Sequence, residues 1–154
     1  MFVGQFQFTL DTKKRLVIPS KFRTFFPEEE KEQGVYVTVN AIKQNNNVTN
    51  YLAIYPFPAW QKHTELLTDS ARKNEEARLY LLKMSTDTEF CNVDSQWRIV
   101  VPLRLINTAG LKRDIMITGV IDHLRVWDLE KWHEIAGWLK EHSTELERFT
   151  YPTS

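Results

Sequence analysis

Three adjacent cations, Lys13, Lys14 and Arg15, are the residues whose types and spacing most readily suggest chemistry. An arginine guanidinium can form two parallel hydrogen bonds to a phosphate or to the edge of a guanine, and a lysine supplies a compact positive charge. Three cations in a row serve no evident purpose in folding, so the triplet favours an anionic partner. In the alternative interpretation, Arg15 pairs with Asp11 and only holds a turn together; the sequence alone leaves both open.

A nine-residue frame around this triplet occurs twice in the chain. The frame Asp-x-x-x-Arg-x-x-x-Pro spans residues 11–19 and recurs 83 positions later over residues 94–102, with apolar residues at matching positions. So much agreement indicates that one structural unit is used twice. The corresponding pairs are Asp11 and Asp94, Arg15 and Arg98, and Pro19 and Pro102.

The two copies differ in charge at the turn. Gln96 and Trp97 stand in the second copy where the first has two lysines, and the nearby cations there are Arg98 and Arg104. We therefore expect the first copy to bind the anion and the second to support the fold. Asp94 and Arg98 are assigned a structural or secondary role, as is Asp11.

The composition excludes several classes of protein. With 20 basic and 20 acidic residues the 154-residue chain has no net charge, which argues against a general polyanion binder. Charge is instead segregated, because the first 25 residues carry five cations against Asp11 alone, a balance of 5 − 1 = +4. No apolar run approaches the roughly 20 residues that span a bilayer, and Met1–Gly4 lacks signal-peptide features, so we expect a cytosolic protein. The single cysteine, Cys91, excludes an intrachain disulfide and is expected to be a buried thiol.

No catalytic constellation is visible. The chain has no Gly-rich phosphate loop, no Gly-x-Ser-x-Gly and no Cys–His pair at metal-binding spacing. Consecutive glutamates such as 28–30 and 75–76 are typical of a solvated surface. We expect no enzyme activity, no metal, no cofactor and no small-molecule substrate. The four histidines are scattered and are His63, His123, His133 and His142.

Hydrophobic periodicity predicts the elements that position the two turns. Alternating apolar residues over 2–10 and a β-branched run over 15–18 predict a β-hairpin with its tip at Asp11–Lys14, and Pro19 ends its second strand. After the first hairpin we expect a short helix over 21–26, a solvated turn at 28–33, and strands over 35–39 and 51–55 separated by a polar loop at 43–46. Helices over 60–67 and 70–84 follow, and then a second hairpin over 89–101 and a helix ending at Gly110. The last expected elements are strands over 114–120 and from 123, a C-terminal helix over 129 to about 149, and a loose tail.

These elements divide the chain into a first repeat, a helical connector, a second repeat, and a C-terminal helix with its tail, over residues 5–59, 60–87, 88–131 and 132–154. Residues 123–132 correspond to residues 51–60 at an offset of 72, so the first copy carries 11 extra residues, which we assign to an insertion around 44–50. A unit of about 45 residues is marginal for independent folding. We therefore expect an α+β fold, in which two repeats complete each other's core in one intertwined barrel-like domain flanked by helices.

Four motifs, in their order along the chain, resemble the MraZ family of bacterial transcription regulators, which are made of two SpoVT-AbrB repeats. They are Met-Phe-x-Gly at the start, Leu-Asp-x-Lys-x-Arg-Leu-x-Ile-Pro over 10–19, Leu-x-Ile-Tyr-Pro over 52–56, and Val-Trp-Asp over 126–128. The resemblance covers nearly the whole chain. It implies a swapped-hairpin β-barrel formed by the two tandem repeats, and assembly into a homo-oligomeric ring.

The resemblance also implies a function. The family binds double-stranded DNA at short direct repeats in the promoter of its own division and cell-wall gene cluster, usually as a repressor, in the cytoplasm and nucleoid. Its DNA-contacting loop carries over to Lys13 and Arg15, and we expect Lys14 to add a contact to the DNA backbone. No membrane partner is implied.

One departure from the family pattern lies in the turns themselves. The family often has glycine between the lysine and the arginine, where this chain has Lys14 and, in the second copy, Trp97. Either the turn type differs here, or a strained backbone is accepted. The alternative function is a protein-interaction ring that does not touch DNA, which Trp97, Trp138 and the neutral charge keep open.

Overall fold

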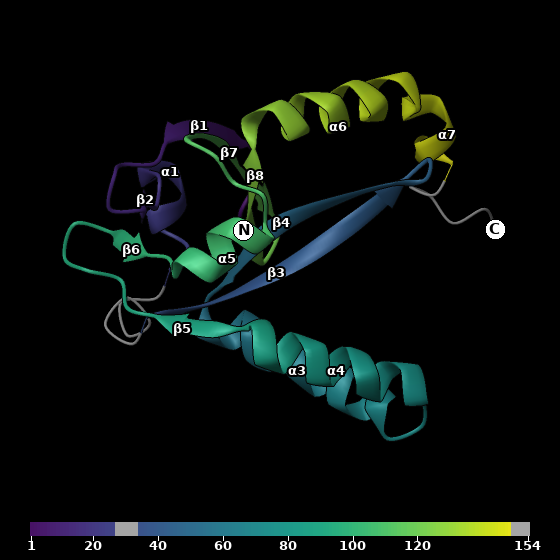
Figure 1. Cartoon of the computed structure of the whole chain (residues 1–154). Coiled ribbons are helices and arrows are strands. Elements are labelled where there is room, and N and C mark those ends of the chain that lie inside the picture. The colour runs from purple at the N-terminus through teal and green to yellow at the C-terminus, as the bar shows by residue number, and fades with distance from the viewer. Residues whose placement is uncertain (27–33, 149–154) are drawn as a thin grey trace.

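The computed structural model of the chain describes residues 1–26 and 34–148 (Figure 1). The predicted turn at 28–33 and the predicted tail lie outside the described residues. The described strands are β1 (Gln5–Thr9), β2 (Arg15–Val17), β3 (Val35–Gln44), β4 (Asn47–Tyr55), β5 (Glu89–Cys91), β6 (Arg98–Val100), β7 (Asp114–Val120) and β8 (His123–Asp128). The described helices are α1 (Ser20–Arg23), α3 (Phe57–Ala71), α4 (Glu75–Asp87), α5 (Leu103–Thr108), α6 (Leu129–Glu141) and α7 (Ser143–Glu147).

Strands from the two predicted repeats pair with one another in a single antiparallel sheet of order β1-β7-β8-β4-β3-β5. Strand β1 of the first repeat pairs with β7 of the second, from Gln5 opposite Thr118 to Thr9 opposite Asp114. Strand β5 of the second repeat pairs with β3 of the first. The chain is therefore an α+β protein in which each repeat supplies an edge strand to the other.

The predicted hairpin around Asp11–Lys14 is wrong in its pairing. The two flanking strands do not pair with each other, because β1 continues along β7, where the Leu10 amide donates to the Arg113 carbonyl (2.9 Å), and β2 pairs with β6. The second turn does close locally, through a bridge between Val93 and Ile99. Within the described residues the six-stranded sheet stays open at β1 and β5, so a closed barrel is not found.

Strands β2 and β6 form a separate two-stranded ladder with approximate two-fold symmetry. Leu16 lies opposite Ile99 at its centre, and both side chains are fully buried. The ladder is extended equally at its two ends, where Ile18 donates to the Trp97 carbonyl (2.9 Å) and Val101 to the Lys14 carbonyl (3.5 Å). The two copies of the sequence frame thus become two equivalent halves of one small structure.

The insertion in the first repeat lengthens a hairpin and does not form the predicted loop. Strand β3 continues to Gln44 and β4 starts at Asn47, with only Asn45 and Asn46 between them at φ 44° and 56°. Asparagine tolerates this left-handed conformation better than most residues do, so the polar run makes a tight two-residue turn. The long hairpin reaches toward α6 and α7 in Figure 1.

Two predicted helix boundaries need correction. The predicted helix over 70–84 does not start at residue 70: α3 ends at Ala71, and Asn74 caps α4, its side chain accepting hydrogen bonds from the amides of Glu76 and Ala77. The predicted C-terminal helix is divided at His142 into α6 and α7, and both the amide and Nδ1 of His142 lie near the Trp138 carbonyl, at 3.0 and 2.9 Å. Of the helices in the described ranges, none has the length and apolarity needed to cross a membrane.

Candidate nucleic-acid interface

The turn that carries the cation triplet is organised by one carboxylate. Oδ1 of Asp11 accepts hydrogen bonds from the backbone amides of Lys13 and Arg15, both at 3.0 Å, and the Asp11 carbonyl accepts from the Lys14 amide, also at 3.0 Å. Oδ2 faces Nε of Arg15 at 2.6 Å. An aspartate that satisfies several backbone amides at once fixes the path of the chain through the turn.

The ion pair with Asp11 leaves part of Arg15 available. It engages only Nε, and among the described residues no acceptor bonds to the terminal nitrogens Nη1 and Nη2. The side chain remains 30% exposed. The two interpretations of Arg15 are therefore compatible, because the contact that holds the turn together leaves both terminal nitrogens without a partner among the described residues.

Asp11 is held in its charged form by the turn. The hydrogen bond from the Arg15 amide, with the Arg15 side chain in addition, lowers the pKa of Asp11 below its ordinary 3.8. A lowered pKa means that this contribution to folding is present above pH 3.8 and is lost as the pH falls through the folded-state pKa. Asp11 is therefore ionised at neutral pH and can accept these hydrogen bonds.

The second turn repeats this geometry. Oδ1 of Asp94 accepts from the amides of Gln96 (2.8 Å) and Arg98 (2.9 Å), and Oδ2 accepts from Nε of Arg98 (2.8 Å). Among the described residues the terminal nitrogens of Arg98 also lack a partner, and the side chain is 31% exposed. The pKa of Asp94 is lowered for the same reason as that of Asp11, chiefly by the Arg98 amide.

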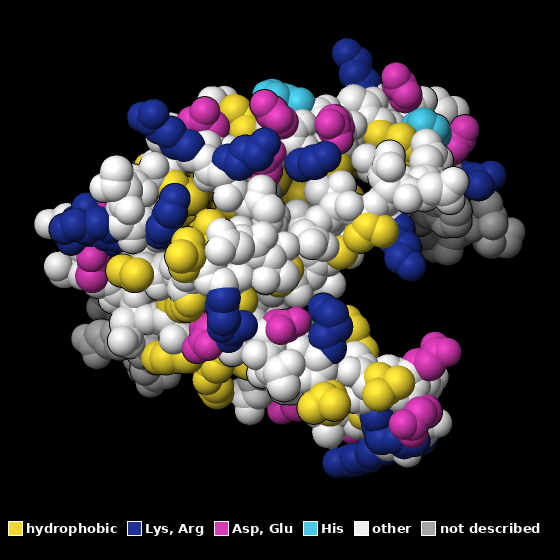
Figure 2. All heavy atoms as spheres, in the orientation of Figure 1, with side chains coloured by type: hydrophobic (Ala, Val, Ile, Leu, Met, Phe, Trp, Pro, Cys, Tyr) yellow, Lys and Arg dark blue, Asp and Glu magenta, His cyan; other side chains and the backbone are white. Residues whose placement is uncertain are grey.

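The ladder places the two arginines on one face. Arg15 lies opposite Val100, and Arg98 lies opposite Val17, so the arginines are diagonal neighbours across the two strands. Because side chains alternate between the faces of a strand, both point away from the buried Leu16, and diagonal neighbours lie roughly 7–8 Å apart. Both turns project on the left of Figure 1, where Figure 2 shows Lys and Arg side chains gathered.

Two of the five N-terminal cations serve the fold. Nζ of Lys21 donates to the Gln5 carbonyl (2.5 Å), and Nε of Arg23 donates to the Ile18 carbonyl (2.9 Å). The predicted +4 patch is thus reduced to Lys13, Lys14 and Arg15. The sequence missed the proximity of Arg98, because only the cross-repeat register between β2 and β6 reveals it.

Both unusual turn residues adopt the left-handed backbone conformation. Lys14 has φ 57° and Trp97 has φ 61°, so the turn type is the same in both copies. Of the two alternatives that the sequence left open, a different turn type or a strained backbone, the structure has the strained backbone. The two side chains differ in their surroundings. Trp97 packs on the main core, edge-to-face with Phe26 (5.8 Å between ring centres), with the Arg23 guanidinium 5.8 Å from its ring. Trp97 therefore supports the fold.

Glycine at these two equivalent positions should have opposite effects on stability. Lys14→Gly removes the steric strain of a side chain in the left-handed conformation and should raise the free energy of unfolding by about 0.5–1 kcal/mol. Trp97→Gly removes the same strain but also the packing of the indole on the core, so it should lower the free energy of unfolding by about 2 kcal/mol. Urea unfolding followed by circular dichroism measures both. Changes of the same sign in the two variants would contradict this account of the turns.

A metal site and a reactive thiol find no support in the part of the chain that the structure describes. Among them, no three His, Cys, Asp or Glu side chains gather closely enough to hold a metal ion. The predicted thiol Cys91 is buried, and burial raises its pKa to about 11, so it is a poor nucleophile. The two-turn face of the β2–β6 ladder is the candidate site.

Comparisons with known proteins point to one family. The family described as "MraZ protein, putative antitoxin-like" matches residues 1–83 and 84–149 of the chain. A "Transcriptional regulator MraZ" of Pediococcus pentosaceus is 30% identical over 95% of this chain and 94% of its own. Proteins of the same name from Mycobacterium ulcerans and Lachnoclostridium phytofermentans are 32% and 33% identical, over 87% and 86% of this chain and 85% and 84% of theirs.

Proposed function

The chain belongs to the MraZ family, and from that premise we propose that it is a DNA-binding transcriptional regulator that contacts DNA with the two-turn face of the β2–β6 ladder. The observation that carries the proposal is the state of Arg15. Its ion pair with Asp11 fixes the side chain through Nε and leaves Nη1 and Nη2 for a ligand. An arginine held in this way can approach a guanine edge or a phosphate without further ordering.

Each residue of the face has a distinct proposed role. Arg15 reads a base edge together with Lys13, and Lys14 contacts a phosphate, which positions the protein without specifying sequence. Arg98 is a secondary contact, because it lies on the same face of the ladder as Arg15 and its terminal nitrogens have no partner among the described residues. Asp11 and Asp94 do not touch DNA but orient the two arginines.

We further propose that the regulator works as a homo-oligomeric ring, acting as a repressor at short direct repeats upstream of its own division and cell-wall gene cluster, within the nucleoid. A neutral subunit with one small basic face is expected to bind DNA weakly through a single contact. A ring presents several such faces at intervals, and avidity multiplies the single contacts. The strand exchange between repeats supports the related proposal of a swapped-hairpin barrel of two SpoVT-AbrB repeats.

Binding to the protein's own upstream DNA tests the function. Fluorescence anisotropy with that fragment, against a scrambled fragment of equal length, should show at least a 1,000-fold preference, the low end of what specific DNA-binding proteins reach. The logarithm of the association constant should fall with the logarithm of the salt concentration, by about 0.9 for each phosphate contacted.

A lysine variant sharpens the salt measurement. Lys14→Gln removes one proposed phosphate contact and should reduce the salt slope by about 0.9 per bound subunit while leaving the preference between fragments unchanged. Lys73→Gln, at an exposed lysine between α3 and α4, is the matched control and should leave the slope as it is. Absence of DNA binding by an assembled protein would favour the alternative function, a protein-interaction ring.

A further inference from the structure

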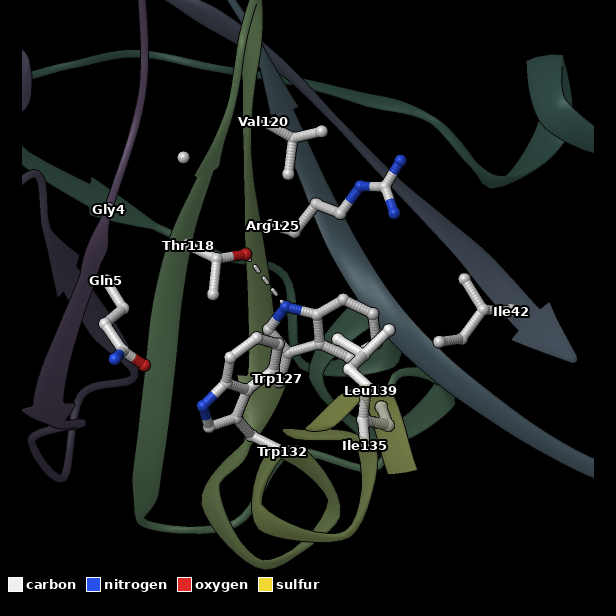
Figure 3. A pocket seen from close by; sticks show the side chains of 11 residues that line it. Gly4, Gln5, Ile42, Thr118, Val120, Arg125, Trp127, Trp132, Ile135 and Leu139 are labelled. Carbon is white, nitrogen blue, oxygen red and sulfur yellow. Dashed lines mark hydrogen bonds between the residues drawn. The ribbon is translucent and has the colours of Figure 1, made fainter. Parts of the chain in front are cut away.

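Two hollows on the described surface differ in the chemistry of their linings. The larger of the two, about 540 Å3, lies between the sheet and α6, where Trp127 and Trp132 form an apolar wall (Figure 3). The cation in its lining, Arg125, is already engaged, because its Nε donates to His123 (3.0 Å) and its guanidinium carbon lies 4.7 Å from the centre of the Tyr51 ring. This groove is therefore a poor site for an anion.

The second hollow, about 480 Å3, lies beside the first turn. The Leu10 amide donates to the Arg113 carbonyl (2.9 Å), so the pairing of β1 with β7 brings an arginine of the second repeat to the turn of the first. The hollow adjoins the two-turn face of the ladder, because the same turn carries Arg15. Its lining residues are Leu10, Asp11, Thr12, Lys14 and Arg113.

The charges around this second hollow favour an anion. Asp11 is the carboxylate in the lining, and the turn occupies both of its oxygens, Oδ1 with two backbone amides and Oδ2 with Nε of Arg15 at 2.6 Å. Lys14 and Arg113 are the cations in the lining, and among the described residues neither side chain has a hydrogen bond or an ion pair. Two cations without a partner and one neutralised carboxylate leave the hollow with an excess of positive charge.

The two neighbours of Arg113 in the sequence make their contacts elsewhere. Nζ of Lys112 lies 3.9 Å from the Glu130 carboxylate on α6, and the Asp114 carboxylate accepts a hydrogen bond from the Thr9 hydroxyl (3.1 Å). Neither Lys112 nor Asp114 lines the hollow. Successive residues of an extended chain point to opposite sides, so Arg113 is the residue of this segment that faces the first turn.

We propose that this hollow is a phosphate subsite of the DNA interface, in which Arg113 neutralises a backbone phosphate beside the one that Lys14 contacts. The inference rests on the proposed function and adds to it a residue of the second repeat. An arginine suits this role, because its planar guanidinium matches two oxygens of a phosphate. Phosphate contacts fix how a protein sits on the duplex without reading its sequence, so Arg113 positions the turn from which Arg15 reads a base.

Salt titration of DNA binding tests the subsite. Arg113→Gln should reduce the salt slope by about 0.9 per bound subunit, so that a roughly fourfold rise in salt weakens its binding about 3.5-fold less than that of the wild type. The upstream and scrambled fragments should lose affinity equally, since a phosphate contact carries no sequence information. Arg113→Lys keeps the charge and should keep the slope. Lys112→Gln, at the exposed neighbour outside the hollow, is the matched control and should leave the slope unchanged.

Phosphate ethylation interference on the upstream fragment locates the contact. Ethylation of one phosphate per bound turn should block the wild type but not Arg113→Gln, and this phosphate should lie next to the one at which Lys14→Gln becomes insensitive. Arg113 is exposed and has no partner among the described residues, so the variant should fold as the wild type does.

The two measurements separate the subsite from the proposed function. An unchanged slope and an unchanged interference pattern in Arg113→Gln, or an equal loss of slope in Lys112→Gln, would overturn the subsite and leave the proposed function in place. Wild-type protein that binds neither DNA fragment would overturn the proposed function, and the subsite with it.

Discussion

Replacing Arg15 with alanine should weaken binding to the upstream DNA by about 30-fold per engaged subunit and abolish the preference over a scrambled fragment. A bidentate arginine contact to a base discriminates by about 1–3 kcal/mol, and 2 kcal/mol corresponds to roughly a 30-fold change. In the proposed ring several turns engage DNA at once, so the loss multiplies, and the variant should show no specific binding in the same anisotropy measurement.

Two controls separate recognition from folding in the Arg15 experiment. Arg15→Lys keeps the charge but loses the planar fork, so it should keep the salt dependence and lose most of the preference between fragments. Arg72→Ala removes an exposed arginine whose guanidinium lies 3.6 Å from Asp69, remote from the ladder in sequence, and should leave binding unchanged. Unchanged affinity and an unchanged preference between the two DNA fragments in a folded Arg15→Ala protein would contradict the assignment of Arg15 as a DNA contact.

Shortening Leu16 to alanine should produce the largest loss of stability, about 3 kcal/mol. Leu16 is fully buried and sits opposite Ile99 at the centre of the ladder, where both halves of the structure meet. Replacement of a buried leucine by alanine costs about 2–5 kcal/mol, since the removed methyl groups leave a cavity. The free energy of unfolding, obtained from urea titration followed by circular dichroism, gives the value.

The neighbouring Val17 provides the comparison for Leu16. Val17 belongs to the same strand but faces outward and is only half-buried, so Val17→Ala should cost less than about 1 kcal/mol. Ile99→Ala, at the symmetry-related centre, should resemble Leu16→Ala. Equal losses for Leu16→Ala and Val17→Ala would show that the two faces of the ladder are not packed as described.

The local features of the fold were predictable from sequence, and the long-range pairings were not. Asp11 and Asp94 were placed correctly in tight turns, because an aspartate bonding to the next amides is a matter of a few residues. The hairpin around the first turn was wrong, because β1 finds its partner in β7, more than 100 residues away, where Thr9 also bonds to Asp114. Alternation of apolar residues identifies a strand but not its partner.

The local part of the candidate site could be predicted from the sequence, and the contacts that depend on long-range pairing could not. The cation triplet and the Asp–Arg pairing could be inferred from spacing, and the structure shows the pairing in both copies. The hydrogen bonds of Lys21 and Arg23 could not be inferred, because their acceptors are the backbone carbonyls of Gln5 and Ile18 and every residue carries such a carbonyl. The start of the helix predicted over 70–84 was wrong because Asn74 fits the helical periodicity but caps α4 with its side chain.

The pairing of β1 with β7 has a consequence for the order in which the protein is made. The first strand to leave the ribosome has its partner at residues 114–118, so it stays without that partner until most of the chain has been synthesised. Contacts of such sequence separation form slowly, because the intervening chain must first be closed into a loop. Release of the nascent chain before residue 118 therefore yields a first repeat with an exposed edge, which is the form most prone to aggregate.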